Sequence, residues 1–432
     1  MTLEGVPGLE VDPLLDDPAT RIVVCCGAGG VGKTTTAAAL GVRAAERGRK
    51  VVVLTIDPAR RLAQSMGIDQ LDNVPRRVDG IEGDGELHAM MLDMKRTFDE
   101  IVEAHADPER ARAILGNPFY QSLSAGFAGT QEYMAMEKLG QLRSREEWDL
   151  IVVDTPPSRS ALDFLDAPKR LGSFLDGTFI KLLMAPAKVG GRAGMKFLNV
   201  GMSMMTGTLG KLLGGQLLRD VQTFVAAMDT MFGGFRTRAD ATYRLLQAPG
   251  TAFLVVAAPE RDALREAAYF VERLAAERMP LAGLVLNRVH GSGAAALSAE
   301  RALAAAENLE EGRIVDQGPG KTGVRGPEAT SPEPGAPRTT AALPDAAATT
   351  TDVTSVVNTD VTAPPAVAEL TAGLLRLHAE RMQVLAREKR TRDRFAALHP
   401  EVAVAEVPAL PGDVHDLAGL RAIGDRLAAG RH

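Results

Sequence analysis

The stretch RIVVCCGAGGVGKTTT, at residues 21–36, decides the fold. It opens with a β-branched apolar run that predicts a buried strand, and it ends in a Thr-rich run that predicts the start of a helix. Between them, residues 27–34 follow the pattern Gly-x-x-x-x-Gly-Lys-Thr. Glycines let successive backbone N–H groups turn around an anion, and the N-terminus of the following helix adds the positive end of its dipole. A strand before the pattern and a helix after it predict a nucleotide phosphate loop rather than a turn without a ligand.

Two side chains of this loop have distinct predicted roles. Lys33 is expected to reach the β- and γ-phosphates of ATP or GTP, and Thr34 to offer its hydroxyl to Mg²⁺. The remaining contacts to the nucleotide in this part of the chain are expected from Gly27, Gly29, Gly30, Val31, Gly32 and Thr35.

Further short β-branched runs bounded by turn signals predict the rest of a sheet. With the first strand, the predicted strands are residues 21–26, 50–56, 87–92, 150–153, 252–257, 281–286 and 402–407. Helical stretches, such as residues 34–47 and 260–278, lie between several of them. This alternation is typical of a doubly wound α/β fold with a mostly parallel sheet.

Three segments interrupt this alternation. Residues 95–146 and 166–247 show helical spacing without strand candidates and are predicted to be helical insertions. Residues 308–366 are rich in Thr, Ala, Pro and Gly, so they are predicted to form a disordered linker that cannot bury enough apolar surface to offset chain entropy. The predicted organisation is an N-terminal tail at 1–20, core at 21–94, a helical insertion at 95–146, core at 147–165, a Met-rich helical insertion at 166–247, core at 248–307, the linker at 308–366, and an amphipathic helix with C-terminal core at 367–432.

Two of the predicted strands are followed by a carboxylate. Asp57 follows residues 50–56 and Asp154 follows residues 150–153. The carboxyl ends of parallel strands face the crevice in which such sheets bind ligands. Asp57 is therefore predicted to orient an attacking water, with a purely structural helix N-cap as the open alternative, and Asp154 is predicted to lie on the magnesium side of the site. Lys33 and Asp57 are the predicted catalytic residues, and Thr34 and Asp154 the predicted metal-side residues.

Four stretches of the sequence resemble the ArsA-like family of anion-pump and tail-anchored-protein-targeting ATPases. They are GAGGVGKTTT at 27–36, TIDPARRL at 55–62, AMMLD at 89–93 and VVDTPPSRSALDFL at 152–165. The resemblance implies an ATP hydrolase that uses ATP and Mg²⁺. It also implies that Asn287 and the segment around Pro408 contact adenine, and that the chain forms a dimer.

The sequence departs from the family pattern at three places. Ala28 stands where the family has a lysine that reaches across the dimer, so we expect either a slow homodimer or a heterodimer with a lysine-bearing paralogue. The second switch has Arg159 and Ser160 where Gly-His is usual. The only two cysteines, Cys25 and Cys26, are adjacent within a predicted core strand. A zinc-bridged dimer and a thiolate site for arsenite are therefore not expected.

Composition argues against several other classes of partner. The net charge of −6 gives no electrostatic support for a nucleic-acid partner. No apolar run approaches the ~20 residues of a membrane helix, and the acidic residues 1–17 do not resemble a signal peptide. The predicted location is the cytoplasm, with any association with a membrane made through a partner.

Methionines are concentrated in the second helical insertion and lead to the functional alternatives. Their flexible thioethers suit a groove for a hydrophobic protein client, but they also suit an ordinary core or a subunit interface. The leading hypothesis is an ATPase that couples nucleotide state to a helical client- or transporter-binding domain, as in anion transport. The alternatives are a catalytically weak subunit of a heterodimer and a MinD- or ParA-like positioning ATPase, although residues 417–432 are short and only modestly apolar for membrane binding. The methionines are Met184, Met195, Met202, Met204, Met205, Met228 and Met231.

Overall fold

The structure is a computed structural model that describes residues 5–56, 61–118, 120–121, 130–156, 234, 237–315 and 365–429. The chain divides into two compact units. The first combines Met1–Gly291 with Arg387–His432, and the second is Ser292–Ala386. The methionines of the second predicted insertion lie outside the described residues, as do residues 316–364 of the predicted linker. Both predictions therefore stay predictions.

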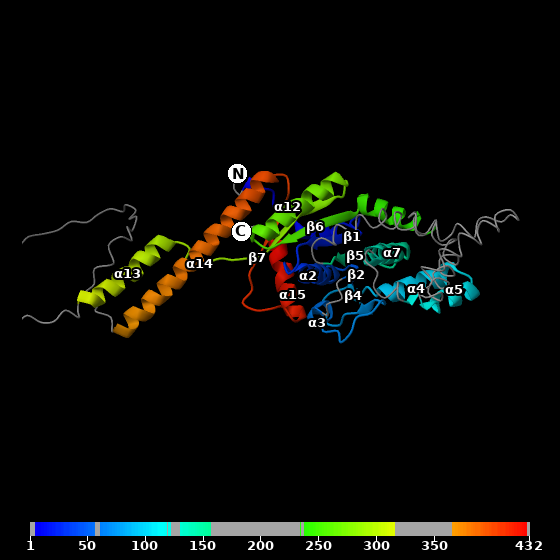
Figure 1. Cartoon of the computed structure of the whole chain (residues 1–432), viewed down its shortest axis with the longest axis horizontal. Coiled ribbons are helices and arrows are strands. Elements are labelled where there is room, and N and C mark those ends of the chain that lie inside the picture. Colours follow the sequence, from blue (N-terminus) through cyan, green and yellow to red (C-terminus); the bar gives the residue numbers. More distant parts are fainter. Residues whose placement is uncertain are drawn as a thin grey trace, which may run out of the picture. The chain divides into compact units, whose positions relative to one another are not determined.

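One eight-stranded sheet forms the centre of the first unit (Figure 1). Its strand order is β3-β4-β2-β5-β1-β6-β7-β8. All neighbouring strands are parallel except the β3–β4 pair, which is antiparallel. The predicted doubly wound, mostly parallel α/β fold is confirmed, with each predicted strand present within a few residues of its expected ends. The strands are β1 Ile22–Gly27, β2 Lys50–Thr55, β3 Arg76–Arg77, β4 Glu86–Met91, β5 Leu150–Asp154, β6 Thr251–Ala257, β7 Leu281–Val289 and β8 Val404–Pro408.

The short strand β3 is absent from the sequence prediction, and its residues explain why. It consists of two exposed arginines, Arg76 and Arg77, that pair with β4 at the edge of the sheet. Two charged residues carry no apolar alternation, so no periodicity marks them as a strand. Charged side chains are a common feature of sheet edges, because they discourage pairing with another chain.

Side chains of the central strand β1 alternate between the two faces of the sheet. Ile22, Val24 and Cys26 belong to one buried cluster, and Val23 and Cys25 belong to the other. Successive side chains of a strand point to opposite faces, so a strand covered on both sides reads as a continuous apolar run. The apolar stretch before the phosphate loop follows from this burial.

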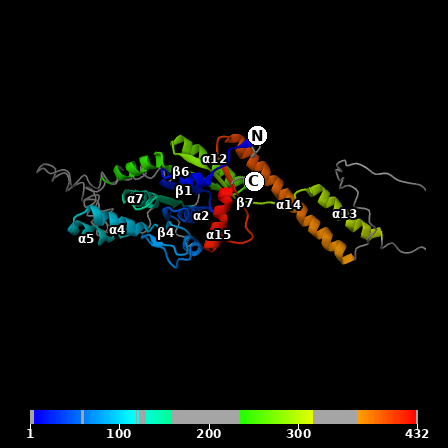
Figure 2. The same ribbon diagram turned by 180° about the vertical axis from the view of Figure 1, so that it is seen from behind.

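Helices cover both faces of the sheet. The cluster that contains Cys25 also contains the buried side chains of α1 Val11–Asp16, α2 Lys33–Glu46 and α15 Leu417–Ala429. Helices α2 and α15 lie side by side in both views (Figure 1, Figure 2). The opposite cluster contains buried side chains of α4 Met94–His105, α5 Pro108–Leu115, α7 Thr130–Ser144 and α12 Arg261–Ala276. This arrangement places the start of α2 beside the carboxyl end of β1.

The second unit holds helix α13, Ala299–Val315, and most of helix α14, Pro365–Leu398. Small buried side chains, including Ala302 and Ala306 on α13 and Ala372 and Ala379 on α14, are at most 1% exposed. An ion pair of 2.7 Å joins Arg376 to Glu310 across the two helices. Helix α13 extends beyond residue 308, where the linker is predicted to begin.

The length and hydropathy of a helix decide whether it could cross a membrane. Within the part of the chain that the structure describes, no helix is both long and apolar enough to cross a membrane.

Candidate nucleotide-binding site

The phosphate loop joins β1 to α2, and two of its glycines are required by close neighbours. Gly27 has φ +147°, and a Cβ there would lie 2.1 Å from the carbonyl oxygen of Val256 on β6. Gly32 has φ +95°, and a Cβ there would lie 2.2 Å from Nδ2 of Asn287 on β7. Both distances are far below van der Waals contact. The loop can pass this close to β6 and β7 only because glycine has no side chain.

The lysine of the loop is held inside its curve. Lys33 begins α2, is 6% exposed, and donates a hydrogen bond from Nζ to the carbonyl oxygen of Ala28 at 2.8 Å. Gly29 and Gly30, by contrast, are exposed at the tip of the loop. The ammonium group thus lies within the turn formed by the loop and at the N-terminus of a helix, where the helix dipole also favours an anion.

Asp154 joins three elements at the carboxyl edge of the sheet. It ends β5 and is 0% exposed. Its Oδ2 accepts hydrogen bonds from Oγ1 of Thr34 at 2.7 Å and from Oγ1 of Thr55 at 2.9 Å. Its backbone carbonyl accepts a hydrogen bond from the N–H of Ile56 at 3.0 Å. One buried carboxylate therefore connects the first turn of α2 with the ends of β2 and β5.

This cluster fits the coordination chemistry of Mg²⁺. Magnesium prefers oxygen ligands and usually keeps several waters, so it is bound by only one or two carboxylates together with substrate phosphates. The Thr34 hydroxyl and the Asp154 carboxylate supply two such oxygens side by side, next to the loop. These are the two residues predicted from the sequence as the metal-side pair.

A hollow of about 520 Å³ begins at the loop and continues over the ends of β7 and β8. A volume of this size lies within the usual range for small-molecule sites, roughly 300–1,000 Å³. Asn287 on its rim donates from Nδ2 to the carbonyl oxygen of Val31 at 2.8 Å, which ties β7 to the loop. Thr35, Asn287 and Pro408, all predicted as nucleotide contacts, line this one hollow together with Gly32, Arg288, His290, Val407, Ala409, Leu410, Pro411, Gly412, Asp413, Val414 and Ile423.

Comparison with known proteins identifies the family. The model of the anion-transporting ATPases, ArsA_ATPase, matches residues 20–303. The chain belongs to this family. Three similar proteins are each named ATPase GET3. Those of Podospora anserina and Ajellomyces dermatitidis are 27% identical over 278 residues and 26% identical over 280 residues, and each match covers 64% of this chain and 75% of the relative. That of Malassezia globosa is 30% identical over 158 residues, which cover 37% of this chain and 45% of the relative.

Membership confirms the resemblance inferred from the sequence motifs and makes the chain an ATPase. The family match covers the phosphate loop, Asp154 and Asn287, and it ends within α13. It does not reach Pro408, β8 or α15, although these complete the hollow and the sheet.

Of the predicted catalytic pair, the structure places only Lys33. Asp57 lies outside the described residues, which stop at Ile56 and resume at Arg61. The role of Asp57 therefore stays a prediction. What the structure does show is that the preceding residue, Ile56, is 1% exposed and is hydrogen bonded to Asp154.

The two cysteines of this ATPase lie on β1, directly before the phosphate loop, and both are buried free thiols. Burial raises the pKa of the Cys25 thiol well above its usual range, and the nearby Asp154 carboxylate adds to the shift. Burial likewise raises the pKa of Cys26 to about 12. Thiolates are the form that binds soft metal ions and reacts with electrophiles. Both side chains thus act as small apolar groups that fill the core.

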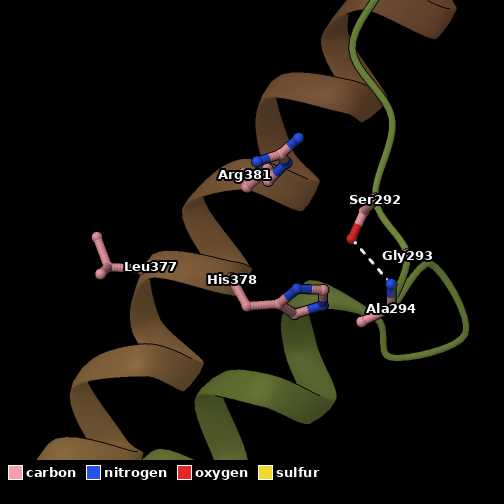
Figure 3. A pocket seen from close by; sticks show the side chains of 6 residues that line it. All are labelled: Ser292, Gly293, Ala294, Leu377, His378 and Arg381. Carbon is pink, nitrogen blue, oxygen red and sulfur yellow. Dashed lines mark hydrogen bonds between the residues drawn. The ribbon is translucent and has the colours of Figure 1, made fainter. Parts of the chain in front are cut away.

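The second unit contains a larger hollow of about 680 Å³ (Figure 3). It is lined by Ser292, Gly293, Ala294, Leu377, His378 and Arg381. His378 is engaged by the carbonyl oxygen of Leu297 through Nε2 at 2.8 Å. No carboxylate that could hold Mg²⁺ and no glycine-rich loop at a helix N-terminus is among the residues that line it.

Three contacts of the site escape prediction from the sequence. Thr55 donates to Asp154, and the only signal for it is a polar residue at the end of a buried run. Arg288 adopts φ +60°, and its N–H donates to Oδ1 of the adjacent Asn287 at 3.0 Å. Gln131 of α7 donates from Nε2 to the carbonyl oxygen of Ile56 at 2.8 Å. No motif predicts the last contact, because it depends on how a helical insertion packs.

We predict that Gly32→Ala lowers the free energy of unfolding of the nucleotide-free protein by about 2–4 kcal/mol, since it combines a left-handed backbone with displacement of Asn287. Gly30→Ala is the matched control, because Gly30 has φ +76° but no atom within 4 Å of the added Cβ. We expect it to cost about 1 kcal/mol. Urea unfolding of both variants measures the difference, and equal losses would show that the Asn287 contact does not constrain the loop.

Proposed function

We propose that this ATPase binds ATP with Mg²⁺ at the loop of residues 27–34 and couples the nucleotide state to a helical domain that binds a hydrophobic protein client or a membrane transporter. The observation that carries the nucleotide part is the buried Asp154 carboxylate, which accepts hydrogen bonds from both Thr34 and Thr55 beside Lys33. It brings a phosphate-binding ammonium and two metal-binding oxygens to one edge of the sheet.

In the proposed complex, the triphosphate lies along the loop and the nucleoside occupies the hollow over the ends of β7 and β8. Lys33 and the N–H groups at the start of α2 bind the β- and γ-phosphates. The hollow supports this placement, because it opens from Gly32 and Thr35 and is bounded by Asn287 and Pro408. Backbone and side-chain amide groups at its rim suit the polar edge of adenine, and the prolines and Val407 suit its faces.

For hydrolysis, we assign Asp57 as the residue that orients and deprotonates the attacking water. The chain leaves β2 at Thr55, which contacts Asp154, and Ile56 is bonded to the same aspartate through its backbone. Asp57 follows directly in the sequence. Magnesium, when bound, neutralises charge that develops on the phosphate oxygens. Lys33 stabilises the same charge from the loop side.

The coupled helical domain is supported by sequence and by kinship. The Met-rich segment supplies flexible apolar side chains suited to varied apolar partners. Two relatives named ATPase GET3 each match 64% of the chain. The described helices α4, α5 and α7 lie between β4 and β5 in the chain and pack in the same buried cluster as β2 and β5. Movement at the nucleotide site is thereby transmitted through packed elements.

We expect Asp57→Asn to keep ATP affinity within about threefold while turnover falls at least about a hundredfold, because the change removes the base without touching the phosphate loop. Asp69→Asn is the matched control, as Asp69 is an exposed acid shortly after α3 Arg61–Ser65. Titration calorimetry and a steady-state ATPase assay check both quantities. Equal loss of affinity and turnover would assign Asp57 to the structural N-cap alternative.

A second candidate function is that of a catalytically weak subunit in a heterodimer. Ala28, at the position of the family's dimer-crossing lysine, is 8% exposed and belongs to the buried cluster around α2. Its carbonyl oxygen already accepts a hydrogen bond from the ammonium group of Lys33. The loop therefore contributes one lysine, and a paralogue that bears the second lysine would have to donate it to this chain's nucleotide.

Under this second candidate, Ala28→Lys accelerates ATP hydrolysis by the isolated chain, on the order of a thousandfold if the added charge acts like an arginine finger. Ala28→Met adds a side chain of similar length without charge and separates the effect of charge from that of bulk. Steady-state ATPase rates of the three proteins test it. Brisk turnover by the unmodified chain, with no gain from the lysine, would exclude a missing charge.

A further inference from the structure

Gln131, near the start of α7, links this helix to the carboxyl end of β2. Its side chain donates a hydrogen bond from Nε2 to the carbonyl oxygen of Ile56 at 2.8 Å. The N–H of Ile56 donates to the carbonyl oxygen of Asp154 at 3.0 Å. Both backbone polar groups of the residue that precedes Asp57 are therefore held, one by the strand that carries Asp154 and the other by α7.

The hydrogen bond from Gln131 is important because of where Ile56 lies relative to the sheet. The ladder between β2 and β4 ends at Thr55, whose carbonyl oxygen accepts from the N–H of Leu92 at 2.9 Å. Ile56 lies beyond that ladder and is 1% exposed, so little water reaches its backbone. A buried carbonyl group that loses its donor bears a desolvation cost, and the chain shifts to avoid it. The amide of Gln131 therefore holds the backbone of Ile56 in place at the end of β2.

Farther along α7, buried charges fix the helix to its neighbours. Glu137, 4% exposed, forms an ion pair with Arg238, which lies in the helix at residues 237–247. Lys138, also 4% exposed, pairs with Glu100 of α4 at 2.8 Å. Each pair has one buried member, and loss of its partner would leave that buried charge uncompensated, so the pairs resist separation. Helix α7 is thus attached to the end of β2 and to two other helices.

We infer that Gln131 is a positioning residue for the carboxyl end of β2 at Ile56, and that α7 carries nucleotide-dependent movement of this end of β2 to the helix at residues 237–247. This inference rests on the proposed function, because residues 237–247 are the C-terminal end of the predicted Met-rich insertion at 166–247. It adds the route of coupling. The connection runs from Asp154 through the backbone of Ile56 to Gln131, and from Glu137 to Arg238.

The test is amide hydrogen exchange of residues 237–247 in the full chain, with Mg²⁺ and either ADP or a non-hydrolysable ATP analogue. This readout does not require turnover. We expect the two nucleotides to give different exchange rates in the unmodified chain. Gln131→Met keeps the length of the side chain but removes the donor, so we expect most of that difference to be lost while affinity for the analogue stays within about threefold.

Two further variants serve as controls. Gln131→Lys retains a donor on a longer side chain and is expected to keep the difference between nucleotides. Gln121→Met removes an amide that donates to the carbonyl oxygen of Leu115 at the end of α5, and it is also expected to keep it. The inference is overturned if Gln131→Met keeps the full difference, or if Gln121→Met loses it equally. No difference in the unmodified chain would contradict the proposed coupling itself.

Discussion

The shared hydrogen bonding of the Asp154 carboxylate is the interaction on which the site depends. A carboxylate with no exposure to solvent is costly unless donors or counter-charges compensate it. The hydroxyls of Thr34 and Thr55 provide two donors at 2.7 and 2.9 Å, and each comes from a different element. One buried group therefore ties the start of α2 and the end of β2 to the end of β5, in addition to the ladder that pairs β2 with β5. The same carboxylate is a suitable ligand for Mg²⁺.

A second constraint is the close approach of the loop to β6 and β7. It depends on the absence of side chains at Gly27 and Gly32, and it lets Asn287 hold the backbone of Val31. The rim of the hollow and the phosphate loop thus form one connected structure rather than two adjacent sites. Because β7 and β8 also border this hollow, the C-terminal strand takes part in the site although it lies beyond the range matched by the family.

Much of the fold is predictable because it follows from local patterns. The apolar runs of β1, β2 and β5 mark strands buried on both faces, and the glycines and Lys33 mark the loop between β1 and α2. The exposed pair that forms β3 carries no such pattern. The contact of Gln131 with Ile56 joins residues 75 positions apart, and it depends on packing that no local spacing encodes. Thr55 lies between these cases, since its position is predictable but its partner is not.

We propose that Asp154 organises the magnesium side of the nucleotide site. Titration calorimetry of ATP with and without Mg²⁺ tests this role most directly. It compares the unmodified chain with Asp154→Asn and with the control Asp149→Asn. Asp149 directly precedes β5, at the end of the strand opposite Asp154, and its carboxylate accepts a hydrogen bond from the N–H of Lys50. We expect Mg²⁺ to strengthen ATP binding in the unmodified chain and in the control, and to have little effect on Asp154→Asn. An equal magnesium effect in a folded Asp154→Asn variant would contradict the account.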